Sequence, residues 1–138
     1  MRSMMIVFPG EKAEAGILPD AQVFAAMMKY NEDLQKAGVL LALEGLHPSS
    51  NGARVSFRGG KPSVTAGPFS NAKDLVGGYW LIRVDSLEGA IAWASRAPMG
   101  DGETIEVRRV YETSDFPAEI FPAELSARER ALIEELKR

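Results

Sequence analysis

The sequence predicts a single α+β domain in which strands and helices alternate along the chain. Its 138 residues match the length of one domain, and 46% of them are hydrophobic, which is enough for an ordinary core. Short apolar runs between turn residues predict strands, and longer stretches with apolar residues at helical spacing predict helices. The resulting order is β-α-β, a hairpin, then β-α-β.

The first strand and the first helix are predicted by the N-terminal residues. Residues 4–8 form an apolar run that Pro9 and Gly10 close, which indicates a buried strand. A helix is expected from Pro19 to about Gly38, because proline is tolerated in a first helical turn. Its apolar face is expected to contain Phe24, Met27, Met28 and Leu34.

The second strand and an inserted hairpin occupy the middle of the chain. The apolar residues 39–46 predict the strand, and residues 47–76 are dominated by turn-forming residues. Within this stretch, polar and apolar residues alternate in 53–57, and 62–65 form a short return segment. We expect a hairpin at the edge of the sheet, where Pro62 can be tolerated although it lacks a ladder donor.

The second half of the domain repeats the strand, helix, strand order. Residues 79–84 are aromatic and β-branched, which predicts a strand with Trp80, Ile82 and Val84 on one face. Asp85 followed by Glu88 fits a helix N-terminus, and Pro98 would end that helix. Residues 104–111 alternate and predict the last strand. The buried face of the helix is expected to be Leu87, Ala90, Ile91 and Ala94.

The C-terminal residues are interpreted as an appendage to the domain. After the last strand, the segment Phe-Pro-Ala-Glu occurs twice, which suggests an extended arm. Ser126 with Glu129 then fits the start of a terminal helix. We therefore divide the chain into a domain at 1–113 and an arm with a C-terminal helix at 114–138.

This element order matches a ferredoxin-like sandwich, in which both helices cover one face of an antiparallel sheet. The opposite face would carry leucine and tyrosine beside charged side chains. Such a face would form an apolar patch larger than soluble monomers usually expose. We therefore expect a homodimer that forms through the uncovered face of the sheet.

Composition excludes several classes of function. Cysteine is absent and there is one histidine, so thiolate zinc sites, iron–sulfur clusters and metal sites with two histidines are not expected, and no metal or cofactor is predicted. A net charge of −3 is a poor match to nucleic acid. The apolar runs are far shorter than the ~20 residues that span a bilayer, so we expect no membrane partner and a cytoplasmic protein.

His47 is the first candidate for chemistry. Histidine is the side-chain type that titrates closest to neutral pH, so His47 would be the most economical general acid or base. Glu44 lies three residues earlier and could orient the ring or share a proton with it. The alternative is a histidine that caps the loop before Pro48 and has no catalytic role.

Four strand residues form a second candidate site. Alternation places Tyr79 and Arg83 on one face of their strand, and Glu106 and Arg108 on one face of its expected neighbour. Charges that face a dimer interior need either partners or a ligand. Two interpretations stay open: ion pairs that fix the dimer register, or a polar cavity where Arg83 or Arg108 holds the carboxylate of a small anionic metabolite.

The loop after the hairpin adds one more candidate ligand donor. Gly67 and Pro68 satisfy a tight turn without any ligand. Lys73, further along the loop, could donate to an anionic substrate, although a lone lysine carries little information. The glycine pairs of the chain match neither a Walker A nor a dinucleotide fingerprint, so nucleotide binding is not predicted.

Several ordered motifs resemble the YCII-related family of the DGPF type. The resemblance covers roughly residues 1–113 and implies a ferredoxin-like subunit that pairs into a dimeric α+β barrel. The motifs are Glu44-Gly45-Leu46-His47-Pro48, Val64-Thr65-Ala66-Gly67-Pro68-Phe69, Lys73-Asp74, Gly77-Gly78-Tyr79-Trp80 and Ile105-Glu106-Val107-Arg108.

The resemblance also bears on activity. Some relatives have a proposed acid–base pair, a histidine in the first helix and an aspartate just before a proline after the second helix. Met27 and Ala97 occupy these positions here, and Ala66 replaces the aspartate of the signature. This favours a small-molecule-binding or regulatory dimer without turnover. The alternative is a cofactor-independent lyase or isomerase that acts on a small acidic metabolite, with His47 as acid or base.

Overall fold

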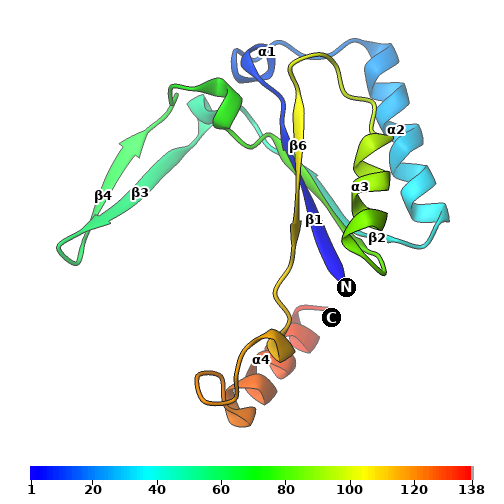
Figure 1. The fold of residues 1–138 in the computed structure, drawn as a ribbon. Coiled ribbons are helices and arrows are strands. Elements are labelled where there is room, and N and C mark those ends of the chain that lie inside the picture. The colour runs from blue at the N-terminus through cyan, green and yellow to red at the C-terminus, as the bar shows by residue number, and fades with distance from the viewer. Residues whose placement is uncertain (138) are drawn as a thin grey trace.

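The computed structural model describes residues 1–137 and contains a four-stranded antiparallel sheet (Figure 1). The order of the strands is β2-β5-β1-β6, so β1 lies between β5 and β6. The predicted α+β class with antiparallel pairing is confirmed, and this order agrees with a ferredoxin-like arrangement. The strands are β1 (Arg2–Phe8), β2 (Leu40–Gly45), β5 (Gly78–Arg83) and β6 (Thr104–Arg109).

Helices α2 (Ala21–Lys36) and α3 (Leu87–Ser95) cover the same face of this sheet (Figure 1). Asp20 caps α2, since its Oδ1 accepts a hydrogen bond from the backbone N–H of Val23 at 3.0 Å. The cap of α3 is Ser86 and not the predicted Asp85, because the helix begins one residue later and the Ser86 hydroxyl accepts from Gly89. A short helix α1 (Glu11–Glu14) was not predicted, because four residues carry no detectable period.

The core lies between these two helices and the sheet. It contains the predicted Trp80, Ile82 and Val84, together with Tyr30, which the sequence analysis missed. The Tyr30 and Trp80 rings meet edge to face with centroids 5.2 Å apart, and the Tyr30 hydroxyl donates to the Trp93 carbonyl at 2.6 Å. Burial raises the pKa of Tyr30 to about 12. The buried hydrophobic residues of this core are Met5, Tyr30, Leu34, Trp80, Ile82, Val84 and Ala90.

The buried faces of both helices are narrower than predicted. Leu34 is fully buried and Met27 packs against the core, but Phe24 and Met28 are more than half exposed. The reason is rotation about the helix axis: the fully covered stripe of α2 runs through Tyr30 and Leu34. On α3 the predicted Leu87 and Ile91 are about half exposed, whereas Ala90 is buried.

Strands β3 (Ala53–Arg58) and β4 (Lys61–Ala66) form a hairpin that projects from the body (Figure 1). This hairpin is a two-stranded sheet of its own and does not extend the edge of the main sheet, in contrast to the expected edge position. The 3-10 turns η1 (Ser49–Asn51) and η2 (Ala72–Asp74) interrupt the chain on either side of it, so neither strand continues a strand of the main sheet.

The C-terminal residues form the turn η3 (Thr113–Asp115) and the helix α4 (Ala123–Leu136) beyond the end of β6 (Figure 1). Helix α4 begins directly after Pro122, so Ser126 lies inside it and not at its predicted start. Stacked rings of Tyr111 and Phe116, with centroids 4.7 Å apart, order the connection to β6. The larger apolar side chains of α4 remain partly or mostly exposed: Leu125, Leu132, Ile133 and Leu136.

Candidate functional site

The sheet face opposite the helices carries all of the strand residues predicted as ligand-binding. We call it the open face. Cross-strand pairing forms two adjacent rows of side chains on it. The first row is Glu44, Tyr79, Ile6 and Glu106. The second row is Ala42, Leu81, Met4 and Arg108. Arg83 lies beyond the second row, opposite Arg2.

Two ion pairs organise the charges at and near this face. Arg108 contacts Glu106 on its own strand at 3.2 Å, and both side chains are well exposed. Arg2 forms a two-pronged contact with Glu112, in which its Nε and one terminal nitrogen lie 2.9 and 3.2 Å from the carboxylate oxygens. The hydrogen bonds from Arg2 lower the pKa of Glu112. Sequence reasoning missed this second pair, because its residues are 110 positions apart.

His47 lies apart from the open face, in the loop that follows β2. Its Nδ1 faces the side-chain nitrogen of Asn51 at 3.2 Å. Glu44, the residue expected to orient the ring, belongs to the first row of the open face, next to Tyr79. Lys73 lies in η2 with an exposed side chain. The structure therefore groups the predicted strand residues together and places His47 and Lys73 elsewhere.

His47 lines a hollow of about 350 Å³ at the base of the hairpin, which we call the hairpin-base hollow. Ser49 organises it: its backbone N–H and its hydroxyl both donate to the Glu14 carboxylate, and the hydroxyl oxygen accepts from the N–H of Phe69 at 2.9 Å. The hydrogen bonds from Ser49 lower the pKa of Glu14. Glu14, Ser49 and Phe69 were not candidates, since no motif connects residues so far apart in sequence.

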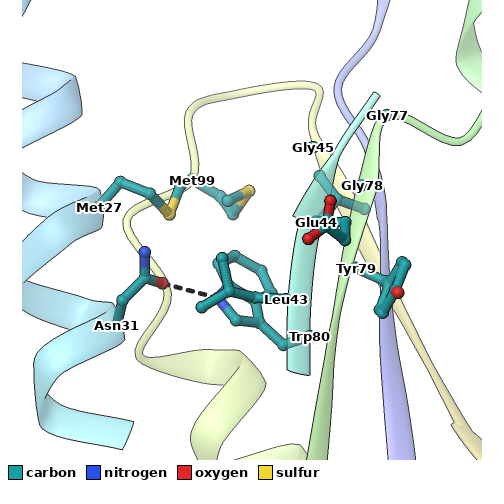
Figure 2. A pocket seen from close by; sticks show the side chains of 11 residues that line it. Met27, Asn31, Leu43, Glu44, Gly45, Gly77, Gly78, Tyr79, Trp80 and Met99 are labelled. Carbon is teal, nitrogen blue, oxygen red and sulfur yellow. Dashed lines mark hydrogen bonds between the residues drawn. The ribbon is translucent and has the colours of Figure 1, made fainter. Parts of the chain in front are cut away.

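A second concavity lies between α2 and the end of the sheet, and Figure 2 shows its lining. This α2 cavity has a volume of about 190 Å³. Trp80 closes its floor, and the indole N–H donates to the Asn31 side-chain oxygen at 2.7 Å. The side chains that line it from α2, from the covered face of the sheet and from the loop after α3 are Val7, Met27, Asn31, Leu43, Trp80 and Met99.

Glycines allow the strands to approach closely beside this cavity. A Cβ on Gly77 would lie 2.4 Å from the ring of Pro9, and one on Gly78 would lie 2.7 Å from the carbonyl oxygen of Glu44. Both positions therefore require glycine for steric reasons. The Gly77-Gly78 pair of the sequence motif thus has a packing role at the rim of the α2 cavity.

Residues 1–114 match the model of the YCII-related domain. The chain belongs to the YCII-related family. No curated protein matches the sequence significantly. Among solved structures, it is similar to 5-chloro-2-hydroxyhydroquinone dehydrochlorinase from Burkholderia phenoliruptrix in complex with 2,5-dihydroxybenzoquinone, with 13% identity and a TM-score of 0.43 over 85% of this chain and 100% of that one.

Within residues 1–137, no three histidine, aspartate or glutamate side chains gather where they could hold a metal ion. In the same part of the chain, no helix combines the length and the hydropathy needed to cross a bilayer.

Proposed function

We propose that this protein, a DGPF-type member of the YCII-related family, is a homodimer that binds a small molecule in the α2 cavity without turning it over. The observation that carries the proposal is the chemistry of the cavity lining. Met27 and Met99 supply flexible, polarizable walls, and Trp80 supplies a flat aromatic surface. Such a lining favours an apolar ring over a charged metabolite.

The size of the α2 cavity defines the ligand class. An apolar cavity of about 150 Å³ is enough to hold benzene. At about 190 Å³, the α2 cavity matches a single substituted ring. The Asn31 oxygen is occupied by the Trp80 indole, which leaves the Asn31 amide N–H groups to donate to the ligand. We therefore expect a neutral one-ring compound with an oxygen acceptor.

The placement of the titratable groups supports binding without turnover. Around this cavity, within the described residues, those groups are Glu44 and Tyr79. Their place in one row of the open face directs them to the other side of the sheet. Met27 occupies the position where some relatives have their proposed catalytic histidine, and a methionine cannot transfer a proton. Binding without proton transfer is the chemistry that remains.

The homodimer is proposed on the open face. Ile6, Met4 and Leu81 form its centre and are only partly covered within one chain. A second copy related by a two-fold axis would present the same rows and cover these side chains. The pair of Arg108 and Glu106 would then lie at the interface, where it could fix the register.

A catalytic alternative remains, in which His47 acts as acid or base of a lyase or isomerase on a small acidic metabolite. One observation supports it: His47 and Glu14 line the same hollow. Glu14, and not Glu44, would then be the carboxylate that accompanies the imidazole.

Titration with phenol, followed by two-dimensional NMR, tests the α2 cavity. We expect saturable shifts at Trp80 and Asn31 and an unchanged phenol spectrum. Met27→Phe fills the cavity and should abolish binding, whereas Met28→Phe, at the exposed neighbouring position, should retain it. Equal binding by both variants would contradict the location, and conversion of the probe would contradict the absence of turnover.

A second variant covers the case in which Met27→Phe does not fold. Met27→Ala enlarges the cavity and should shift its preference from phenol toward the two-ring probe 1-naphthol, because a void gains affinity for a larger apolar guest. Unchanged preference in a folded Met27→Ala protein would contradict the proposal as firmly as binding to Met27→Phe.

A further inference from the structure

We infer that the hairpin-base hollow is a second ligand site, which binds a small monocarboxylate with an apolar or aromatic body. The key residue is Arg54, at the start of β3. Its guanidinium carbon lies 4.0 Å from the centre of the Phe69 ring. Among the described residues, no carboxylate forms an ion pair with Arg54. The N–H groups of this guanidinium are therefore available, in the planar fork that fits a carboxylate.

The platform beneath Arg54 is held in place by several contacts. The Phe69 N–H donates to the Ser49 hydroxyl oxygen at 2.9 Å, and the Gly67 N–H donates to the Gly52 carbonyl at 2.9 Å. A Cβ on Gly67 would lie 1.7 Å from the Ser49 carbonyl oxygen, so the two loops are in direct backbone contact. A ring fixed in this way holds the guanidinium in a preorganised position, which lowers the entropy lost on binding.

His47 supplies a second donor to the same hollow. In the orientation that the structure gives the Asn51 amide, its nitrogen donates to Nδ1 of His47. The neutral ring then carries its proton on Nε2, where it can donate to an anion. His47 and Arg54 both line the hollow, so one carboxylate can be met by a charged donor and a neutral donor.

Glu14 restricts the charge of the ligand. Its carboxylate also lines the hollow and accepts two hydrogen bonds from Ser49. One positive and one negative side chain therefore face the site, together with the His47 imidazole. A dianion such as phosphate would be repelled by Glu14, whereas a monoanion placed against Arg54 is tolerated. Leu46, Leu75 and Val76 complete the lining and would contact the apolar body of the ligand.

Benzoate and its neutral isostere benzamide are suitable probes. Isothermal titration and NMR should show saturable benzoate binding with shifts at His47 and Phe69, and benzamide and inorganic phosphate should bind at least about tenfold more weakly. Equal binding of benzamide would overturn the inference. Met27→Phe should leave benzoate binding intact, so failure of the α2 cavity proposal and failure of this one are distinguishable.

Arg58 provides a matched control for Arg54. Both residues lie on β3, four positions apart and therefore on the same face, and both are exposed. Arg54→Met should weaken benzoate binding at least about tenfold, and Arg58→Met should change it by less than about twofold. Arg54→Lys, which keeps the charge but loses the planar fork, should be intermediate. Equal losses of benzoate affinity in Arg54→Met and Arg58→Met would show that only the net charge of the protein matters, and would overturn the proposed site.

Discussion

Apolar side chains are buried in the helix-covered body of this protein and exposed on its two projections, the β3–β4 hairpin and helix α4. In the body, Met5, Leu34 and Ile82 are fully buried between the helices and the sheet. On the β3–β4 hairpin, Phe57 is 75% exposed, and Leu136 on α4 is 77% exposed. Within one chain, the apolar side chains of the body therefore cover one another, whereas those of the projections stay exposed.

The hairpin shows this most clearly. Val55 pairs with Val64 and Phe57 pairs with Pro62, so these side chains share one face of the two-stranded ribbon. A two-stranded hairpin is marginally stable in water without a third layer. The hairpin reaches away from its own body (Figure 1). We therefore expect the second chain of the proposed homodimer to cover its apolar face.

The largest expected effect is on the free energy of unfolding, and it compares an alanine substitution in the body with one in a projection. Leu34→Ala removes a fully buried side chain and should lower the free energy of unfolding by about 3 kcal/mol, through lost burial and the resulting cavity. Leu132→Ala on α4 should lower it by less than about 0.5 kcal/mol, with a loss that depends on protein concentration. Urea unfolding measures both losses. If the two variants lost similar free energies of unfolding, independent of protein concentration, the difference between body and projections would be refuted.

The next effect concerns the hairpin in the homodimer. Phe57→Asp places a charge on the apolar face and should raise the dimer dissociation constant about tenfold or more. Ser56→Asp adds the same charge to the opposite face of the same strand and should have little effect. Sedimentation equilibrium distinguishes them. A wild-type monomer throughout the micromolar range would contradict the dimer itself.

Local chemistry explains which parts of the fold were predictable from the sequence. Gly38 has a φ of 75°, the left-handed conformation that glycine adopts easily, so the end of α2 could be predicted. Trp80 and Ile82 alternate with less buried neighbours, which identified the covered face of β5. Signals of this kind depend on residues within one or two turns of each other.

The two concavities could not be predicted in the same way. Glu14 and Ser49 are 35 positions apart, and Asn31 and Trp80 are 49 positions apart. No spacing rule connects such pairs, because their contact depends on how α1, α2 and the loops pack against the sheet. His47 was singled out by its residue type alone, whereas Arg54, which lines the same hollow, was not a candidate.

A smaller effect is expected from the Arg2–Glu112 ion pair, which lies in the body just before the C-terminal arm begins. The hydrogen bonds from Arg2 lower the pKa of Glu112, so this pair stabilises the protein above the ordinary glutamate range and loses its effect as pH falls through the lowered value. Because both groups are partly exposed, we expect Glu112→Gln to remove no more than about 1 kcal/mol at pH 7.

Thermal unfolding from pH 7 to pH 3 checks the sign of this contribution. The difference in melting temperature between wild type and Glu112→Gln should narrow as pH falls below the ordinary glutamate range and the wild-type carboxylate becomes protonated, and it should shrink in high salt. A gap that stays constant with pH would show that the contact acts through packing and not through charge. Glu119→Gln, on the arm outside this pair, is the matched control.

The smallest expected effect lies inside the body, at Ser3. Its side chain is fully buried in β1, and it is the one residue of the described chain whose buried side-chain oxygen lacks a hydrogen-bond partner. Ser3→Ala removes that unsatisfied hydroxyl, so the free energy of unfolding should stay unchanged or rise by up to about 1 kcal/mol. Ser86→Ala removes a hydroxyl of the same type that caps α3 and should lower it by about 1 kcal/mol. Urea unfolding of the two variants compares an unused hydroxyl with a used one, and a loss at Ser3 equal to that at Ser86 would show that the Ser3 hydroxyl has a partner after all.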